Sequence, residues 1–414
     1  MWRNRNLDFL IGSLVISRAG DTFTFLALAI RVDSLYTDPT QSARSLGIVL
    51  MAFALPQLVF GLFAGTLVDR WDRRRVMIAA DLARAALIPL LVFLRTPGDI
   101  LWAAVLAFAV SSFSAFFYPA RTALLPAVVE DEELMAANSW MQVGETVARL
   151  VGPILAGMVI GLWGGNVAFL FDSASFVGSA LCLFLVWGVE SKVQTASAGG
   201  SASAWKDLVE GVRYALGNRL LQAVTIGIAL ALLGIGGVDV LIVPFTRFAF
   251  NAPPEALGLL MTVQGAGMLV GGLMIGAFSN RWSPVKIAVA STALLAFGLG
   301  AFGMAPSYLV GLMVVPVFGF ALPPLNASLQ TLLQTEIPGE MLGRAGALVE
   351  MASSSAYMLS MAAAGPVSTV VGLRHTYVLS GVLVMTAAVT MAWLLRSHQA
   401  GSRIPAVEPV VIER

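Results

Sequence analysis

The sequence predicts an all-α integral membrane protein with twelve transmembrane helices in two pseudo-symmetric bundles of six. Three observations lead to this fold class: an apolar composition, the spacing of the apolar segments and an internal repeat. Of the 414 residues, 58% are hydrophobic and 12% are charged, whereas soluble domains carry about 25% charged residues. This small fraction of charged residues cannot cover a water-facing surface of this size. Lipid is therefore the expected solvent for much of the chain.

Twelve segments are long and apolar enough to form transmembrane helices, because about 20 residues of helix cross the hydrocarbon core. In chain order they lie near residues 8–34, 46–68, 76–94, 99–120, 140–162, 166–188, 220–247, 256–279, 285–304, 308–333, 345–371 and 374–395. Most loops between them are short, so we expect neighbouring helices to be antiparallel. The start of the chain is too short and polar for a cleaved signal peptide, so the first segment is expected to remain in the membrane.

Basic residues predict the orientation of these helices. Most of the 25 Lys and Arg residues fall on the side that carries both termini. The positive-inside rule therefore places both termini in the cytoplasm, and two termini on one side require an even number of helices. We expect a multi-pass protein of the cell inner membrane.

A polar linker separates the two predicted bundles. The predicted organisation is a six-helix bundle at 1–189, a cytoplasmic linker at 190–217, a second six-helix bundle at 218–396 and a disordered cytoplasmic tail at 397–414. Apolar residues recur at helical spacing between Trp205 and Leu216, with charged residues between them. This pattern predicts an amphipathic helix, which either lies on the cytoplasmic membrane face or connects the bundles through water.

The two predicted bundles repeat each other in sequence. Residues 65–71, Gly-Thr-Leu-Val-Asp-Arg-Trp, end the second predicted helix, and residues 276–282, Gly-Ala-Phe-Ser-Asn-Arg-Trp, end the eighth. Duplication of a six-helix unit indicates a transporter with a central site between two bundles. A channel, receptor or membrane enzyme does not require it.

The segment that begins at Gly65 and continues through Asp69 and Arg70 to three consecutive arginines resembles the loop signature of the major facilitator superfamily. The resemblance covers nearly the whole chain and implies alternating access by a monomer. It also implies a latch that joins the cytoplasmic ends of the bundles in the outward-open state, formed by Gly65, Asp69, Arg70, Arg73, Arg74 and Arg121. The alternative for the arginines is a positive-inside anchor with no switching role.

Gly152, Pro153 and Gly157 in the fifth predicted helix resemble the Gly-Pro motif of exporters in this superfamily. Proline removes a backbone hydrogen bond and bends a helix, and the motif favours export over import. The stretches 17–21 and 118–121 are similar to the branch that holds the macrolide efflux proteins and the enterobactin exporter. This chain departs from many drug–proton antiporters of the superfamily in its fourth helix. Those proteins carry an arginine there, whereas residues 100–118 of this chain contain no charged side chain.

A charge near the bilayer centre costs at least about 2.5–3.5 kcal/mol on insertion scales, so charged residues within the predicted helices are candidates for function. Arg18 and Asp21 share one helix face, as do Glu145 and Arg149; Arg84 also lies within a predicted helix. The candidates for proton coupling or substrate binding are Asp21, Arg18, Asp239, Glu145, Arg149, Asp172 and Glu350.

We expect Asp21, beside Arg18, to take up and release a proton during transport, since burial and neighbouring charge set the proton affinity of a carboxylate. The alternative is a permanent ion pair that fixes helix packing, and the same alternative applies to Glu145 and Arg149. Asp239 has no basic residue within two helical turns, which makes it a second candidate for binding a proton or a cationic substrate.

Neutral polar residues in the predicted helices are candidates for lining a cavity. They are Gln57, Gln264, Asn326 and Gln330. An apolar wall with a few polar groups suits an amphipathic organic substrate, although such side chains also hydrogen-bond between helices without binding a ligand.

Several function classes are disfavoured. One cysteine, Cys182, and two histidines exclude an internal disulfide and leave no set of side chains for a metal site. We expect no cofactor, no nucleic-acid partner and no enzymatic activity, because no phosphate-binding glycine loop or nucleophile–base set is present. The sequence predicts a secondary active exporter of a small amphipathic or lipophilic drug, antibiotic or siderophore, driven by protons. The alternatives are an importer or lysophospholipid flippase of the same fold, and a non-transporting membrane sensor or partner-binding protein.

Overall fold

The computed structural model describes residues 4–68, 71–187, 212–253, 255–279 and 281–401. Within these ranges the regular structure is helical. The first half contains α1 (Arg5–Ser34), α2 (Pro39–Val68), α3 (Arg73–Leu87) with the 3₁₀ turns η1 (Ile88–Phe93) and η2 (Pro97–Asp99), α4 (Ile100–Val128), η3 (Asp131–Glu133), α5 (Leu134–Trp163) and α6 (Gly165–Phe184). The second half contains α8 (Arg219–Pro244) with the π turn η4 (Phe245–Ala249), α9 (Glu255–Ser279), α10 (Pro284–Met304), α11 (Tyr308–Glu336), α12 (Gly339–Val371) and α13 (Leu373–Gly401).

These helices confirm the predicted fold class. In the described part of the chain, ten helical segments are apolar and long enough to cross a membrane. The other two long helices, α2 and α12, have 30 and 33 residues, which also suffices to span the hydrocarbon core. Helix α12 is more polar because it contains Glu350 and three serines at 353–355. Most of the predicted linker and residues 402–414 of the predicted tail lie outside the described residues, whereas residues 397–401 of that tail form the end of α13.

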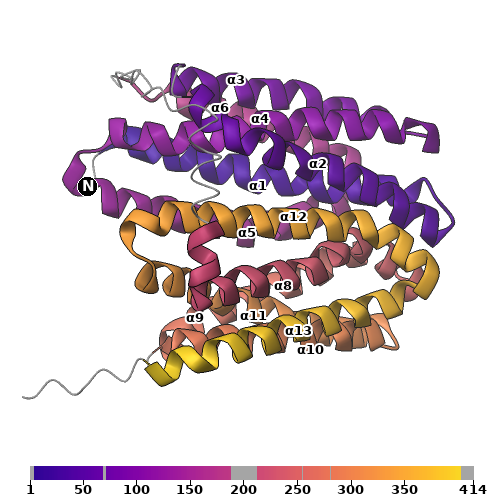
Figure 1. Ribbon diagram of the computed structural model, residues 1–414. Helices are drawn as coiled ribbons and strands as arrows, with labels where there is room; N and C mark the ends of the chain where they lie inside the picture. Colours follow the sequence, from indigo (N-terminus) through magenta and orange to yellow (C-terminus); the bar gives the residue numbers. More distant parts are fainter. Residues whose placement is uncertain (1–3, 69–70, 188–211, 254, 280, 402–414) are drawn as a thin grey trace, which may run out of the picture.

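The helices form two bundles, α1–α6 and α8–α13, which lie one above the other in Figure 1. In the first, α1 packs against α5 and α6, and α2 packs against α4. In the second, α8 packs against α12 and α13, and α9 packs against α11. The bundles meet along two helix pairs, α2 with α12 and α5 with α9.

The closest contacts between the bundles lie at the end opposite the chain termini. A Cβ atom on Gly157 of α5 would lie 2.7 Å from the Cα of Gly258 in α9, and one on Gly365 of α12 would lie 2.8 Å from the Cα of Arg44 in α2. Glycine permits these approaches because it has no side chain. At the same end, Arg247 Nη1 of η4 lies 3.0 Å from Asp33 Oδ2 at the end of α1. The bundles are therefore joined at this end.

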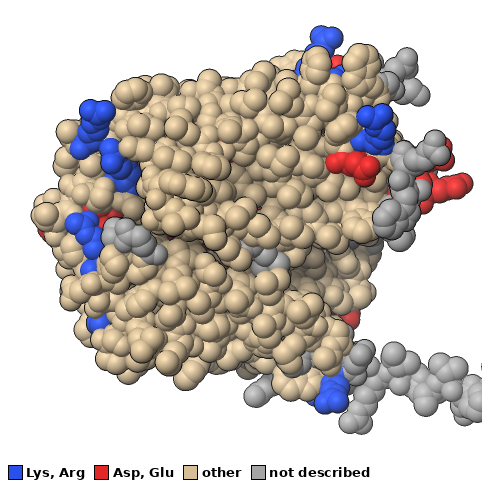
Figure 2. Space-filling view, turned by 180° about the vertical axis from the view of Figure 1, so that it is seen from behind, with Lys and Arg blue, Asp and Glu red and all other residues tan. Residues whose placement is uncertain are grey.

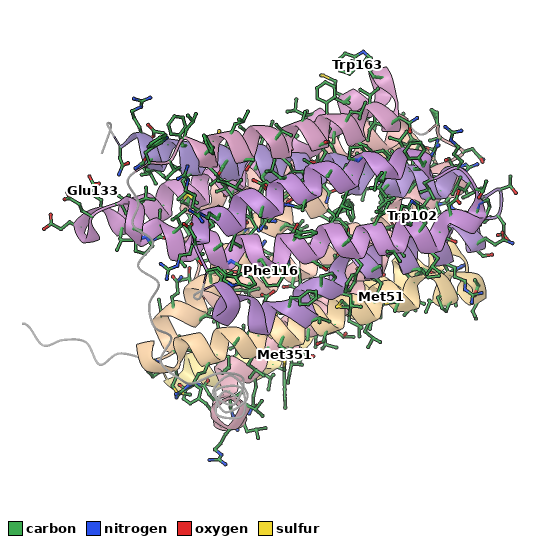
Figure 3. The ribbon with its side chains drawn as sticks, turned by 90° about the horizontal axis from the view of Figure 1, so that it is seen from above. Met51, Trp102, Phe116, Glu133, Trp163 and Met351 are labelled. Carbon is green, nitrogen blue, oxygen red and sulfur yellow. The ribbon has the colours of Figure 1, made fainter. Side chains whose placement is uncertain are left out.

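The surface has the pattern of a membrane-spanning protein. Charged side chains gather at the two ends of the face in Figure 2, and a broad band between them is almost uncharged. Exposed tryptophans, which favour the membrane–water interfaces, lie at both ends. Trp102 and Trp163 lie at the end opposite the termini, as Figure 3 shows. The exposed tryptophans at the terminal end are Trp71, Trp140, Trp187, Trp282 and Trp393.

Candidate functional site

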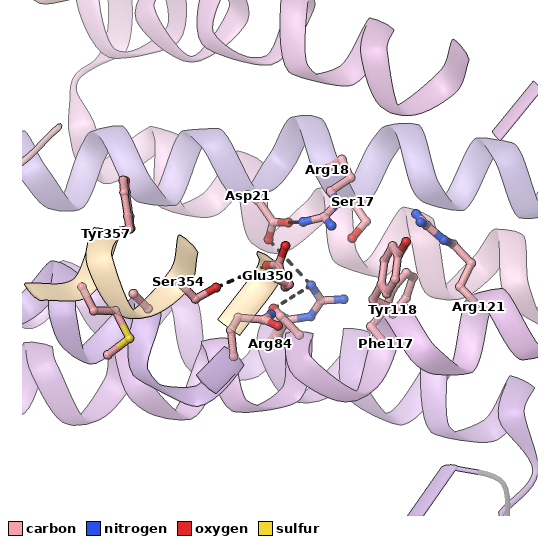
Figure 4. Close-up of a pocket in the computed structure, with 14 residues that line it drawn as sticks. Ser17, Arg18, Asp21, Arg84, Phe117, Tyr118, Arg121, Glu350, Ser354 and Tyr357 are labelled. Atoms are coloured by element: carbon pink, nitrogen blue, oxygen red, sulfur yellow. Dashed lines mark hydrogen bonds and ion pairs between the residues drawn. The ribbon is translucent and has the colours of Figure 1, made fainter. Parts of the chain in front are cut away.

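A cavity of about 370 Å³ lies between the two bundles (Figure 4). Helices α1, α2, α3 and α4 form one wall, and α12 forms the other. Its charged lining residues are Arg18, Asp21, Arg84, Arg121 and Glu350. Asp21 lies near the middle of α1, and Arg84 lies near the middle of the helical segment Arg73–Phe93 that α3 and η1 form, so these charges are well away from both ends of the molecule.

Asp21 sits between two arginines. Its Oδ2 is 3.7 Å from Arg18 Nη1, and its Oδ1 is 3.7 Å from Arg84 Nη1. Both separations exceed the length of a hydrogen bond, and 24% of the Asp21 side chain is exposed. The ion pair with Arg18 confirms the pairing expected from their spacing, and Arg84 is a second partner that the spacing did not predict.

Arg84 of α3 has partners on several sides. Its Nη2 donates a hydrogen bond to Asp81, one helical turn earlier. Its Nη1 donates to Ser114 Oγ of α4 at 3.2 Å. The guanidinium lies 4.0 Å from the ring centroid of Phe176 and 5.0 Å from that of Phe117, distances typical of cation–π contacts. An arginine therefore does reach the uncharged part of α4, but it comes from α3.

Asp81 is also buried, and Ser179 Oγ of α6 donates to it at 2.6 Å. Asp81 and Arg84 were absent from the candidate residues, although a spacing of three residues marks them as a pair on one helix face. Arg84 joins this pair to Asp21. The first bundle thus contains a continuous network from its interior to the cavity.

A second charged cluster lies nearer the terminal end of the cavity. Glu145 of α5 accepts a hydrogen bond from Arg149 at 3.0 Å, which confirms the predicted pair. Glu145 Oε2 is 3.5 Å from Arg121 Nη2, and Glu145 Oε1, which accepts from Arg149, is 3.8 Å from Arg18 Nη2. Arg121, a predicted latch residue, is buried and lies 4.8 Å from the ring centroid of Tyr118. It therefore lies in the cavity wall, with its ion-pair partner in its own bundle.

Asp172 of α6 is completely buried. Ser175 Oγ donates to one carboxylate oxygen at 3.2 Å, whereas the other oxygen has no hydrogen-bond partner within the described part of the chain. Gly20 of α1 packs directly over it, since a Cβ atom there would lie 2.5 Å from the Asp172 carboxylate. This residue is part of the interior of the first bundle and does not line the cavity.

The wall of the second bundle has a different character. A second lobe of about 410 Å³ lies between α8, α11 and α12, and it shares Glu350, Ser354 and Tyr357 with the first. Its lining is mostly aliphatic, with Asn326 and Gln330 among the polar groups. These two residues thus have the cavity-lining position that was predicted, as does Gln57 in the first lobe.

Asp239 of α8 is hydrogen-bonded to Tyr357 of α12, whose hydroxyl donates to Oδ2 at 2.7 Å. Asp239 does not line either lobe, but Tyr357 lines both. Tyr357 therefore stands between Asp239 and the cavity.

Gln264 of α9 contacts α11 through its backbone: a Cβ atom on Gly319 would lie 2.3 Å from the Gln264 carbonyl oxygen.

The remaining predicted residues lie in helix contacts. Gly152 packs against α1, where a Cβ atom would lie 3.2 Å from the carbonyl oxygen of Ala19. Pro153 lies inside α5, and Gly157 forms the contact with α9. Arg73 and Arg74, which were predicted to belong to a latch, donate to backbone carbonyls of their own bundle, at Ala123 and at Leu183 and Phe184. Gly65 lies in the last turn of α2, while Asp69 and Arg70 lie outside the described residues.

In the ranges that the structure covers, no group of three or more His, Cys, Asp or Glu residues is arranged to hold a metal ion. The charged and apolar side chains that line the cavity offer ionic and hydrophobic contacts to a ligand. This suits passage of a ligand between two walls.

Comparisons with known proteins agree with this description. An MFS-type transporter of Bacillus subtilis is 27% identical over 404 residues, which cover 94% of each chain. Macrolide efflux protein A of Streptococcus pyogenes is 25% identical, covering 85% of this chain and 88% of that protein. The multidrug efflux pump Tap of Mycobacterium tuberculosis is 28% identical, covering 90% of each.

Among solved structures, a bacterial homologue of the human lysosomal transporter Spinster, in an inward-facing and unoccupied conformation, matches with a TM-score of 0.77. The sequence identity is 14%, and the match covers 98% of this chain and 100% of that one. The family model of the Major Facilitator Superfamily matches residues 10–238 and 224–411. The chain is therefore a transport protein rather than an enzyme, and it belongs to the major facilitator superfamily.

Proposed function

We propose that this protein is a secondary active exporter that carries a small amphipathic compound out of the cell in exchange for protons. The observation that carries the proposal is the cavity between the bundles, with Asp21 loosely paired to two arginines on one wall and an apolar lobe on the other. A site of this kind near the middle of the helices is what alternating access between two bundles needs.

The orientation follows from the charge distribution. With the terminal end in the cytoplasm, as the positive-inside rule predicts, the contacts of Gly157 with Gly258 and of Asp33 with Arg247 close the outer side. The conformation is then inward-open, ready to receive a compound from the cytoplasm or from the inner leaflet. The protein functions as a monomer, since each chain contains both walls of the site.

Asp21 is the residue proposed to exchange the proton. Arg84 is fixed by Asp81, Ser114 and two aromatic rings, so its charge stays in place while water reaches Asp21 through the cavity. Rocking of the bundles changes the access of water to Asp21 and its distance from Glu350 on the opposite wall of the cavity, and hydration and neighbouring charge set the proton affinity of a carboxylate. A proton bound on one side can thus be released on the other.

The direction and the substrate class rest on two supports. Pro153 interrupts the hydrogen bonds of α5 beside the glycines that pack against α1 and α9, as in the Gly-Pro motif of exporters. In addition, the relatives described above are named for macrolide efflux and multidrug efflux. Both features favour export of an amphipathic organic compound.

The proposal is tested by expressing the protein in drug-sensitive cells and measuring growth on macrolides and lipophilic dyes. We expect increased tolerance of at least one of these compounds, which Asp21→Asn removes and Asp239→Asn preserves. Inside-out vesicles should remove the same compound from the medium only when a proton gradient is present. Unchanged tolerance across the panel, together with no gradient-driven uptake, would contradict the proposal.

A further inference from the structure

The two lobes of the cavity meet at one face of α12. Glu350, Ser354 and Tyr357 line both lobes, and their spacing of four and three residues places them on the same side of the helix. The first lobe has a volume of about 370 Å³ and the second of about 410 Å³. A ligand that extends from one lobe into the other must therefore pass these three side chains.

Glu350 differs in its pairing from Asp21, which also lines the cavity, and from Glu145, which lies behind the cavity wall. Asp21 has Arg18 and Arg84 as partners, and Glu145 has Arg121 and Arg149. Glu350 accepts a hydrogen bond from Ser354 Oγ at 3.2 Å, and no ion pair with it is found among the residues described. Its side chain is exposed to the cavity. It is thus a carboxylate at membrane depth that has no cationic partner within the described ranges.

The second lobe supplies no cation for Glu350. Its lining on α8 and most of its lining on α11 are aliphatic, and its polar groups other than Glu350 are neutral, among them Asn326 and Gln330 of α11. An unpaired charge at membrane depth is costly, so a ligand that brings its own positive charge gains a partner there. The apolar walls beside it exclude water and favour an apolar ligand body.

We propose that the substrate is an amphipathic organic cation, with its positive group at Glu350 and its apolar body in the lobe between α8, α11 and α12. This inference rests on the proposed function and specifies its substrate class. The arginine-rich wall of the first bundle then repels the cation, which orients it towards the second bundle. Asn326 and Gln330 remain available for hydrogen bonds with polar groups on the body.

The test uses two ions of the same shape and opposite charge, tetraphenylphosphonium and tetraphenylborate. Their binding to the full-length protein in lipid nanodiscs is measured by equilibrium dialysis, with empty nanodiscs as the blank. We expect the wild type to bind the cation and to discriminate against the anion. Glu350→Gln should weaken cation binding by roughly tenfold or more, the loss associated with one charged interaction, and Glu350→Asp should retain part of it.

Glu132→Gln is the matched control, since Glu132 is an exposed carboxylate at the terminal end outside both lobes. It should bind both ions as the wild type does. A Glu350→Gln protein that is folded and binds the cation with wild-type affinity would overturn the inference, as would a wild type that prefers the anion.

The experiments give different results if the inference fails and if the proposed function fails. If the inference alone is wrong, cells still gain tolerance of some compound, but Glu350→Gln leaves the charge preference unchanged. If the proposed function is wrong, the wild type exports none of the panel and shows no proton-driven uptake.

Discussion

The two bundles present different walls to the same cavity. The wall of the first bundle is ionic, with Arg18, Asp21, Arg84 and Arg121, and its charges continue inward to the buried Asp81. The wall of the second bundle is apolar, apart from a few neutral groups and Glu350. The bundles share a helical plan and a sequence repeat, so the difference lies in the residues that each places at the centre.

This difference separates two tasks that an exchanger must perform. A proton needs a carboxylate whose surroundings change with conformation, and the ionic wall contains Asp21 in that position. An amphipathic compound needs an apolar surface with few polar groups, and the second wall has this character. The following predictions test this division of labour, from the largest expected effect to the smallest.

Replacing Arg84 with alanine should have the largest effect on stability. It leaves Asp81 buried without its cation and removes one partner of Asp21. Breaking a buried pair in this way costs about 3–5 kcal/mol, so the thermal unfolding temperature in detergent should fall strongly. Arg149→Ala is the matched control, because 66% of the Arg149 side chain is exposed and such pairs contribute about 1 kcal/mol or less. Equal effects of the two changes would mean that the ionic network does not stabilise the first bundle.

Gly157→Ala should shift the protein away from the conformation seen here. Its Cβ atom would lie 2.7 Å from Gly258 Cα, and overpacking of this kind costs about 1–3 kcal/mol, or roughly 5- to 150-fold in population. Spin labels at positions 132 and 335, in a Cys182→Ser background, report the separation of the bundles at the terminal end. In Gly157→Ala, we expect the shorter distances between the two spin labels to become more populated than in the wild type.

The matched control is Gly272→Ala, since a Cβ atom there meets no other atom within 4 Å. It should leave the distance distribution unchanged. An unchanged distribution for Gly157→Ala would show that this contact does not hold the bundles together.

Asp33→Asn should produce a smaller shift in the same direction. The Arg247–Asp33 pair measures 3.0 Å, but 33% of the Arg247 side chain is exposed, so its contribution is about 1 kcal/mol, roughly fivefold in population. The same spin-label measurement detects this change. Exchanging the two residues, Asp33→Arg with Arg247→Asp, should restore part of the wild-type distribution, whereas a pair without a gating role would show no rescue.

Asp99→Asn should leave the pH profile of transport between about pH 5 and 8 unchanged. Backbone hydrogen bonds from Arg95 and Thr96, and the Thr96 hydroxyl, hold the pKa of Asp99 below its usual value of 3.8. Because the folded-state pKa is lowered, the stabilisation is present above the unfolded pKa and is lost as the pH falls through the folded one. Unfolding measurements should therefore separate wild type from Asp99→Asn at pH 7 but not in strong acid. An altered transport profile near neutral pH would mean that this loop takes part in coupling.

The sequence was sufficient to predict the fold and the local ion pairs. Apolar length defined the helices, and a spacing of three or four residues predicted the pairs of Arg18 with Asp21 and of Glu145 with Arg149. The contact between Arg84 and Asp21 was not predictable in this way, because it joins two helices through tertiary packing. The same reason applies to Asp33 and Arg247, which are 214 residues apart.

The sequence alone also did not predict where the Arg121 side chain lies. The resemblance to the superfamily implied a latch role for it, and in the structure its Nη2 lies 3.5 Å from Glu145 of α5, in its own bundle. The spacing of the apolar segments does not predict the conformational state either, because the same helices form both the inward-open and the outward-open conformation. The switching role of the cytoplasmic arginines therefore stays a prediction.

The most direct test of the division of labour compares Asp21→Asn with Glu350→Gln in proteoliposomes that contain a pH-sensitive dye. Tetraphenylphosphonium is added, and its binding and the proton flux that it causes are measured on the same samples. We predict that Asp21→Asn retains cation binding to within about threefold, less than 1 kcal/mol, and loses the proton flux. Glu350→Gln should lose the binding itself. Wild-type flux with wild-type pH dependence in Asp21→Asn would contradict the account.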